Sequence, residues 1–407
     1  MILYPETRAF ANPANFNRVL NQVIPPKLRR QLVEEHAYDW RARKITFNQH
    51  FAALVVHRIG PDRSLRDMGT GVRQRFLYAA YGAHMEVSNA ALSKAHATRP
   101  ADIYLDILDR VMAAIAYLPH RQRVLREVNL DTIEHIRDLL TKVSIFDATT
   151  FELPAQIATW AQVNDTTARC KLQVRLQAGY GGLDKAFLTP GEDHDSLYFA
   201  DFVELSQSGH IYLFDTAYFS IEHYDELTES KNFFVTRKHA NLNIKIVEER
   251  SVPQEVGLSG YTILQDCIVL IGTDERRSSH RYRALEVITS EGEKRWLLTN
   301  LFDLDAEQIA QLWRYRWTIE IMFRWLKSQL KLDHMISYSI NGMLIQVAVA
   351  LIVYGLLVLY NQDATFSPTR LLGQIQQEFE ETIWLHGYLL GFSDAVRLLF
   401  STTWPSS

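Results

Sequence analysis

The feature that most constrains the fold is a change of sequence pattern at Val143. From Phe16 to about Lys142, apolar residues recur three and four positions apart, which is the spacing of amphipathic helices. Val143–Leu153 is instead rich in β-branched and aromatic residues and ends at Pro154, as a strand does. A chain of 407 residues also exceeds the usual size of one hydrophobic core. We therefore expect several domains, helical first and mixed α/β afterwards.

Later segments continue the mixed pattern. Runs of β-branched and aromatic residues predict further strands at Cys170–Leu176, near Ala186–Leu188, at Ile211–Phe214, and at 232–239, 244–250, 267–273, 282–289 and 295–299. Helical spacing predicts helices at Ser196–Leu205, at Ala306–Lys331 after Asp305 as N-cap, at Ile340–Tyr360, and once or twice within Thr369–Leu399. The sequence shows no internal repeat.

The helical amino-terminal part contains the outline of a helix-turn-helix. Ser64–Asp67 has the order of a capping box, and a helix around Arg75–Tyr81 is expected to end at Gly82. A second helix would begin at an N-cap serine and continue to Arg99. Helix, glycine turn, helix is a common DNA-binding outline, although plain helical packing gives the same pattern. The candidate DNA contacts on the second helix are Ser88, Asn89 and Lys94.

Charge is distributed unevenly along the chain, although its net value is only −4. Residues 1–146 hold 21 Lys and Arg against 14 Asp and Glu, a net of +7. The remaining residues hold 22 against 33, a net of −11. A basic part joined to an acidic part fits a module that grips nucleic acid and a body that holds cations. Chance asymmetry is the alternative.

Cysteine usage and the first residues indicate the compartment. Cys170 and Cys267 are too few for a disulfide framework and lack the paired spacing of a zinc site, which fits a reducing environment. The first sixteen residues show no basic segment followed by an apolar one, as a secretory signal would. We expect a cytoplasmic protein.

One segment argues for a membrane instead. Ile340–Leu359 carries no charge over a length that spans a bilayer. Asn341 and Gln346 interrupt it, however, and no basic cluster flanks either end. We favour a buried core helix and expect no membrane partner, with a spanning helix as the alternative.

Two aspartates follow short apolar strands. Asp147 comes after Val143, Ile145 and Phe146, and Asp215 comes directly after the predicted strand that ends at Phe214. A carboxylate at such an interior position is costly unless a cation neutralises it. Paired oxygen ligands of this kind suit Mg²⁺ or Mn²⁺ better than zinc. Taken singly, each aspartate also fits a strand-end cap or a salt-bridge partner.

A third acid, Glu320, lies on a helix with mostly apolar sides. At about 100° per residue, Arg316 lies roughly 40° from it, and Lys327 and Trp313 roughly 20° from it. The four side chains form one stripe. A carboxylate with cations on either side is able to hold a metal ion and the phosphates next to it. An ordinary Arg316–Glu320 ion pair on an amphipathic helix is the alternative.

These segments resemble the bacterial insertion-sequence DDE transposases of the IS-four type, which include the Tn-five-like enzymes. Asp147 and Asp215 stand in sequence contexts similar to the family's two aspartate strands. The family's glutamate helix has the order Tyr, two residues, Arg, three residues, Glu, six residues, Lys. Arg316, Glu320 and Lys327 hold the last three places, whereas Trp313 stands where the family has tyrosine. An indole N–H is able to replace the tyrosine's hydrogen bond to phosphate.

The resemblance implies a ribonuclease-H-like α/β core with a β-rich insertion between the second aspartate and the glutamate, preceded by an all-α DNA-binding domain. The expected division is 1–142 helical DNA-binding domain, 143–231 first part of the core, 232–304 insertion, 305–368 second part of the core, and 369–407 a helical segment able to mediate dimerisation. The tryptophan Trp296 stands in a context similar to a family tryptophan that stacks on a flipped base.

The resemblance further implies a catalytic triad of Asp147, Asp215 and Glu320 that holds two Mg²⁺ ions, for which Mn²⁺ is able to substitute. Arg316, Lys327 and Arg324 would contact DNA, namely the element's terminal inverted repeats and the target. Joining two ends requires at least a homodimer. The expected steps are end nicking, a hairpin intermediate and strand transfer. A domesticated DNA-binding derivative and a ribonuclease-H-like nuclease remain alternatives.

Overall fold

The computed structural model describes most of the chain as two compact units, Met1–Leu118 with Glu152–Ala168 and Arg324–Ser407, and Pro119–Phe151 with Arg169–Phe323. The described residues are 19–40, 42, 45–60, 88–116, 136, 138–179, 182–252, 259–360, 369–373 and 375–376. The expected capping box at 64–67, the expected helix at 75–81 and most of the expected helices after Thr369 lie outside these residues.

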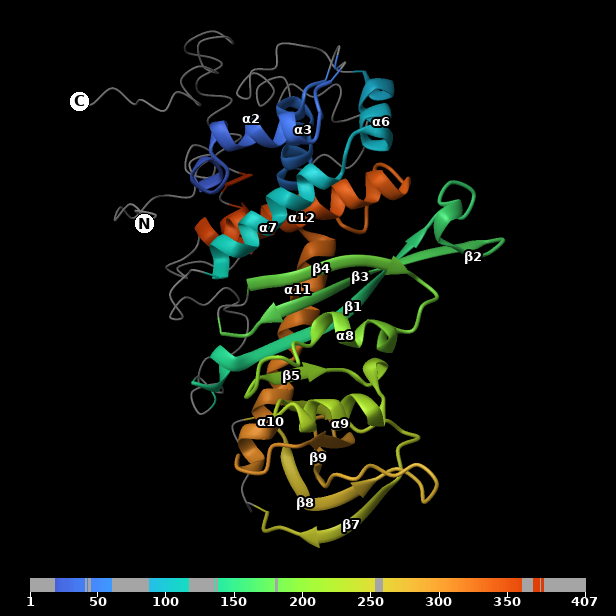
Figure 1. Ribbon diagram of the computed structural model, residues 1–407, viewed down its shortest axis with the longest axis vertical. Coiled ribbons are helices and arrows are strands. Elements are labelled where there is room, and N and C mark those ends of the chain that lie inside the picture. The colour runs from blue at the N-terminus through green and yellow to red at the C-terminus, as the bar shows by residue number, and fades with distance from the viewer. Residues whose placement is uncertain are drawn as a thin grey trace, which may run out of the picture. The chain divides into compact units, whose positions relative to one another are not determined.

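The first unit is built around one long apolar helix (Figure 1). This helix, α12 (Ile340–Tyr360), packs against α3 (Phe47–Ile59), α6 (Asn89–Thr98) and α7 (Asp102–Ala116). The unit also holds α2 (Pro26–Glu35), the 3₁₀ turn η4 (Thr159–Ala161) and the short strand β2 (Gln162–Asn164).

Helix α12 is the one helix of the described residues that is long and apolar enough to cross a membrane. Its apolar stretch of 18 residues is 94% buried inside the protein. Gly355 lets α7 approach closely, since a Cβ there would lie 2.4 Å from Cγ1 of Val111. The polar interruptions also have partners: Asn341 donates to the carbonyls of His96 and Arg99 at 2.8 and 2.7 Å. The expectation of a buried core helix is confirmed.

The second unit carries most of a mixed sheet. Its strands are β1 (Val143–Leu153), β3 (Thr167–Gln177), β4 (Gly182–Pro190), β5 (Ile211–Phe214), β6 (Phe233–Arg237), β7 (Ile244–Glu249), β8 (Thr262–Ile271), β9 (Tyr282–Ile288) and β10 (Lys294–Thr299). Each strand predicted from composition is present, so the α/β fold class is confirmed. The short β2 was not predicted, because only two of its residues pair with β3.

The strand order of the ten-stranded sheet is β2-β3-β1-β5-β6-β10-β9-β8-β7, with β4 also paired to β3. Strands β1, β5 and β6 are parallel neighbours, and the pairings of β6 to β10 and from β10 out to β7 are antiparallel. In the β1–β5 ladder Ile145 lies opposite Leu213. The same register places Asp147 beside Asp215.

An aromatic cluster covers one face of the central strands. Phe146 stacks on Phe214 with ring centroids 5.0 Å apart, and both belong to a buried group with Phe199 and Phe202. Phe199 and Phe202 lie on the short helix α8 (Phe199–Phe202), which follows the 3₁₀ turn η5 (Asp195–Tyr198). Side chains alternate along a strand. Asp147, next to Phe146, therefore points away from this cluster.

Two helical predictions need correction. The helix expected at Ser196–Leu205 is only a 3₁₀ turn followed by the four residues of α8. Lys185 and Arg175 donate to the carbonyls of Asp201 and Phe202, which a longer helix would use itself. The helix expected at Ala306–Lys331 is divided into α10 (Ala306–Tyr315) and α11 (Trp317–Ser328).

The division falls at Arg316, which keeps helical dihedral angles of −52° and −31°. Its backbone N–H is shared between the carbonyls of Leu312 at 3.3 Å and Trp313 at 3.2 Å, which tightens the turn. Asp305 opens α10 with the predicted N-cap, as part of a capping box with Gln308. The chain between β5 and β6 forms the 3₁₀ turn η6 (Thr216–Tyr218) and α9 (Ile221–Glu229). The turn η3 (Leu139–Lys142) precedes β1.

Candidate active site

The two aspartates occupy neighbouring parallel strands at the same level. Asp147 lies inside β1, and Asp215 follows the last residue of β5 as the N-cap of η6. One oxygen of each carboxylate is held by the next residue: Ala148 N–H donates to Asp147 at 2.8 Å, and Thr216 N–H donates to Asp215 at 2.5 Å. These two contacts fix the orientation of both carboxylates.

Arg316 connects the strands to the glutamate. Its Nη2 donates to Oε1 of Glu320 at 2.6 Å, and its Nη1 lies 3.7 Å from Oδ2 of Asp147. The arginine side chain is only 6% exposed, whereas Asp147 and Glu320 are 18% and 32% exposed. All three predicted acids and this arginine belong to the second unit. The structure thus brings Asp147, Asp215 and Glu320 into one neighbourhood, with a cation between two of them.

The electrostatics of the neighbourhood favour an added cation. Burial raises the pKa of Asp147 to about 7, the Arg316 guanidinium and the Ala148 N–H oppose this rise, and the carboxylates of Asp215 and Glu320 add to it. Three acids facing one arginine carry an excess of negative charge. A divalent ion would stabilise the charged forms of these acids.

The ligand set fits a hard cation. All three acids offer carboxylate oxygens, which are the ligands that Mg²⁺ and Mn²⁺ prefer. Within the described ranges, no three Asp, Glu, His or Cys side chains are already arranged to enclose an ion. The contact of Arg316 with both Asp147 and Glu320 accounts for this, because the guanidinium turns one oxygen of each toward itself.

A sequence model of the transposase DDE domain matches residues 138–356, which is more than half of the chain and includes all three acids. The chain belongs to the DDE transposases. Its bacterial insertion-sequence relationship, expected from the three motifs, is confirmed by the relatives that it matches.

Two relatives are named transposases. The chain is 34% identical over 152 residues to a putative transposase y4zB of Sinorhizobium fredii, covering 37% of this chain and 42% of that protein. It is 27% identical over 262 residues to a probable transposase for insertion sequence element IS5377 of Geobacillus stearothermophilus, covering 64% of this chain and 65% of that protein. The matched parts span less than two thirds of each relative.

The fold has a relative among solved structures. A cryo-EM structure of a piggyBac transposase synaptic complex with hairpin DNA matches 98% of this chain and 88% of that chain, with a TM-score of 0.51. Sequence identity is 10%, so the similarity concerns the fold alone.

The other residues of the stripe predicted around Glu320 lie in surroundings that differ from one another. Trp313 is 2% exposed, and its Nε1 has no hydrogen-bond partner among the described residues. The Arg316 guanidinium lies over its ring, 4.7 Å from the centroid. Lys327 and Arg324 are on the carboxyl-terminal half of α11, which belongs to the first unit. Arg324 is exposed, and burial lowers the pKa of Lys327.

Trp296 lines a basic pocket in the second unit. The pocket has a volume of about 630 Å³ and is bordered by Arg237, Lys238, Ala240, Glu293, Lys294, Arg295 and Trp296. Sequence reasoning singled out the tryptophan but missed the cations around it. The signal was present, since Arg237 and Lys238 lie near the end of one predicted strand, and Lys294 and Arg295 lie at the start of another, 295–299. Only the β6–β10 pairing shows that these residues meet.

The amino-terminal DNA-contact candidates lie on α6. Ser88 caps this helix, accepting a hydrogen bond from the Ala91 N–H at 3.3 Å, as the sequence predicted. Asn89 and Lys94 are exposed. The preceding helix of the expected helix-turn-helix lies outside the described residues.

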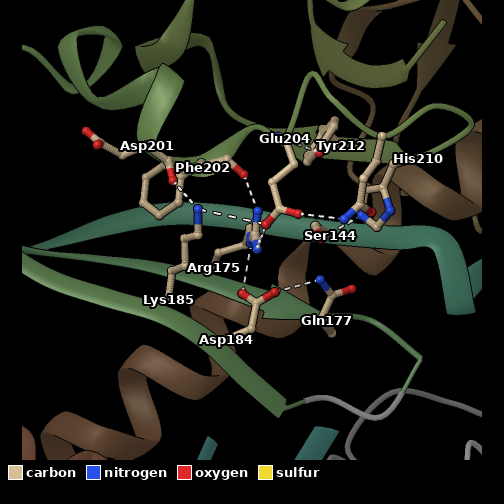
Figure 2. Close-up of polar contacts among 11 residues, drawn as sticks. Ser144, Arg175, Gln177, Asp184, Lys185, Asp201, Phe202, Glu204, His210 and Tyr212 are labelled. Atoms are coloured by element: carbon tan, nitrogen blue, oxygen red, sulfur yellow. Dashed lines mark hydrogen bonds and ion pairs between the residues drawn. The ribbon is translucent and has the colours of Figure 1, made fainter. Parts of the chain in front are cut away.

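A second buried arginine supports the strands that carry the acids (Figure 2). Arg175 on β3 donates to Asp184 at 2.9 Å and to Glu204 at 2.8 Å, and its third nitrogen donates to the Phe202 carbonyl. Sequence reasoning missed this cluster, because its members are far apart along the chain. It joins β3 and β4 to the segment that follows α8.

The same region links the beginnings of β1 and β5, the two strands associated with Asp147 and Asp215. Ser144 Oγ on β1 and Nε2 of His210, just before β5, are 2.8 Å apart (Figure 2). The Glu204 N–H donates to the Tyr212 hydroxyl on β5 at 3.0 Å. These contacts help to fix the register that places Asp147 beside Asp215.

Proposed function

We propose that this protein is a DNA transposase that excises and reinserts an insertion sequence, using Asp147, Asp215 and Glu320 as its catalytic acids. The parallel register of β1 and β5 carries the proposal, because it places Asp147 beside Asp215 inside the residues matched by the DDE domain. Glu320 reaches the same neighbourhood through Arg316.

The three acids would hold two Mg²⁺ ions, or Mn²⁺ in their place. Such ions supply an activated water or 3′-hydroxyl and stabilise the leaving oxygen. The protein's own contribution is to fix the carboxylates: backbone N–H groups orient Asp147 and Asp215, and the rigid β1–β5 pairing sets their separation. Arg316 would position the phosphate beside them.

The proposed reaction begins with a nick at each end of the element. The freed 3′-hydroxyl attacks the opposite strand, forming a hairpin and releasing the flanking DNA. The hairpin is then opened by water, and the same 3′-hydroxyl attacks target DNA. Each transfer forms one phosphodiester bond as another breaks, so the strand exchange needs no external energy source.

Besides Arg316, contacts with double-stranded DNA are proposed at three places. Lys327 and Arg324 would continue the phosphate contacts along α11, and the exposed face of α6, with Ser88, Asn89 and Lys94, would bind the element ends. The third place is the pocket around Trp296. Its cations suit phosphates, and a ring at its wall suits a base displaced from the duplex.

The proposed architecture is a ribonuclease-H-like core containing β1, β3, β4, β5 and α11, with a β-rich insertion at 232–304 and a helical DNA-binding domain at 1–142. The order β4-β3-β1-β5 supports such a core. The protein would act on nucleoid DNA in the cytoplasm as a homodimer that joins two element ends.

The first test is cleavage of a plasmid that carries the element encoding this protein. Mg²⁺-dependent breaks at both element ends, absent in EDTA, are expected. Binding without cutting would contradict the proposal and favour a DNA-binding derivative. Cutting without preference for the element ends would instead favour a ribonuclease-H-like nuclease.

A further inference from the structure

Trp313 departs from the family's residue at its position, and its surroundings differ from those of a DNA-contacting side chain. At 2% exposure its indole N–H is buried, and no hydrogen-bond partner for that N–H lies among the described residues. The ring face, by contrast, is in use beneath Arg316.

Arg316 needs such support. Its Nη2 is hydrogen-bonded to Glu320, but its Nε and Nη1 are buried without a hydrogen-bond partner in the described part of the chain. The Nη1–Asp147 separation of 3.7 Å is an ion pair and not a hydrogen bond. One hydrogen bond and one ion pair define the position of such a long side chain only in part. The indole face beneath the guanidinium plane removes that freedom.

We propose that Trp313 is a positioning residue that fixes Arg316 between Glu320 and Asp147 by stacking, and that it makes no hydrogen bond to DNA. The tight turn at the α10–α11 junction, with Arg316 N–H 3.2 Å from the Trp313 carbonyl, sets the ring under the guanidinium. The two unpartnered N–H groups of Arg316 are then held in place for a phosphate oxygen. This inference rests on the proposed function for its catalytic consequence.

Three substitutions in the full chain separate stacking from hydrogen bonding. Trp313→Phe and Trp313→Tyr keep a ring face, whereas Trp313→Leu removes it. Stacking predicts that the Phe and Tyr variants cleave element ends within about threefold of the unmodified protein, and that the Leu variant is about tenfold slower. If the reaction instead requires an N–H or O–H donor at this position, Trp313→Phe should cleave as slowly as Trp313→Leu. That result would overturn the inference.

Trp325→Leu is the matched control for the loss of a large buried ring. Trp325 is also buried on the neighbouring helix, but it packs against Tyr354 and donates to Thr369. We expect this variant to lose stability while its folded molecules cleave at the unmodified rate. A tenfold slower Trp325→Leu protein would show that ring loss alone explains the Trp313 result.

A double-mutant cycle with Arg316→Gln makes the test independent of catalysis. In urea unfolding, the losses caused by Trp313→Leu and Arg316→Gln should be non-additive, with a coupling of about fivefold in the folding equilibrium constant. Additive losses would overturn the inference. If the unmodified protein cuts no DNA, the proposed function fails, yet the unfolding cycle still decides whether Trp313 fixes Arg316.

Discussion

Two buried arginines of the second unit each face a pair of carboxylates, and they differ in how completely they are satisfied. Arg175 lies between Asp184 and Glu204 (Figure 2), and Arg316 lies between Glu320 and Asp147. Both side chains are 6% exposed. The residue types and the burial are therefore the same in both places.

The contacts differ. Arg175 donates from all three of its nitrogens, and Gln177 donates at 2.6 Å to the second oxygen of Asp184. Among the residues that the structure describes, Arg316 donates from one nitrogen and leaves two without a hydrogen bond. A buried charge without its hydrogen bonds is costly. Such a cost persists in a fold when a ligand is to supply the missing partners.

The pKa values of the carboxyl groups of Glu204 and Asp147, one beside each arginine, shift in opposite directions. The hydrogen bond from Arg175 lowers the pKa of Glu204, whereas burial raises the pKa of Asp147 to about 7 despite Arg316. Burial alone would lower the pKa of Arg175, but its bonds to Asp184 and Glu204 raise it overall. The first cluster is electrostatically complete and stabilises the sheet. The second lacks positive charge, as a cation-dependent site does.

The largest expected effect is a difference between the two arginine variants: one should mainly lose cleavage, and the other should mainly lose stability. Arg316→Gln should slow cleavage of element ends about a hundredfold, because it removes a phosphate contact. It should lower the free energy of unfolding by only about 1 kcal/mol, because Arg316 makes a single hydrogen bond among the described residues. Arg175→Gln should lower the free energy of unfolding by about 3 kcal/mol, because it leaves two carboxylates unpaired. Single-turnover cleavage per folded molecule and urea unfolding measure the two quantities. Equal stability losses would remove the distinction.

Substitution of Asp147 and of Asp184, one aspartate beside each arginine, should change the free energy of unfolding in opposite directions. In EDTA, Asp147→Asn should raise the free energy of unfolding at pH 8 by about 2 kcal/mol, and Asp184→Asn should lower it by about 1–2 kcal/mol. The folded pKa of Asp147 lies above its unfolded value, so its stability contribution is full below about pH 4 and is lost as pH rises to 7. The gain should therefore grow between pH 5 and pH 7. Urea unfolding at both pH values checks the sign.

A smaller effect is expected at Glu204. Its pKa is lowered by Arg175, so the pair stabilises the fold above the unfolded pKa of about 4.3 and loses this contribution as pH falls. At 38% exposure, solvent screening limits the pair to about 0.5 kcal/mol. Glu204→Gln should be less stable than the unmodified protein at pH 7 and equal to it near pH 3. A constant difference across this range would contradict the pairing.

The smallest effect concerns Lys185 at the edge of the Arg175 cluster. Its Nζ lies 3.9 Å from Glu204, and both side chains are more than a third exposed. Lys185→Ala should change the free energy of unfolding by less than about 0.5 kcal/mol. The same unfolding experiment measures both variants. A loss of unfolding free energy as large as that of Arg175→Gln would mean that the exposed Lys185 is needed for the stability of the Arg175 cluster.

Local patterns were sufficient for the elements and for the positions of the acids. Apolar runs before Asp147 and Asp215 predicted one acid inside a strand and one directly after a strand, because adjacent residues determine a strand and its burial. Helical spacing placed Glu320, Arg316 and Trp313 on one stripe, and the contact between the arginine and the indole agrees with it.

Long-range contacts were beyond the sequence. Arg175 meets Glu204 only after β3, β4 and α8 have packed together, and no spacing rule joins positions so far apart. The Arg237 side of the basic pocket likewise depends on the β6–β10 pairing. The break at Arg316 was missed because helical spacing continues through it and no glycine or proline marks it in the sequence. These features arise from tertiary packing, which overrides local preference.

The most direct test of the central claim is cleavage by three isosteric variants, Asp147→Asn, Asp215→Asn and Glu320→Gln, with Asp184→Asn as the control. Each triad variant should lose Mg²⁺-dependent cleavage of element ends by about a thousandfold or more while still binding those ends. Folded Asp184→Asn should cleave normally. Retained cleavage in any triad variant would remove that residue from the catalytic site.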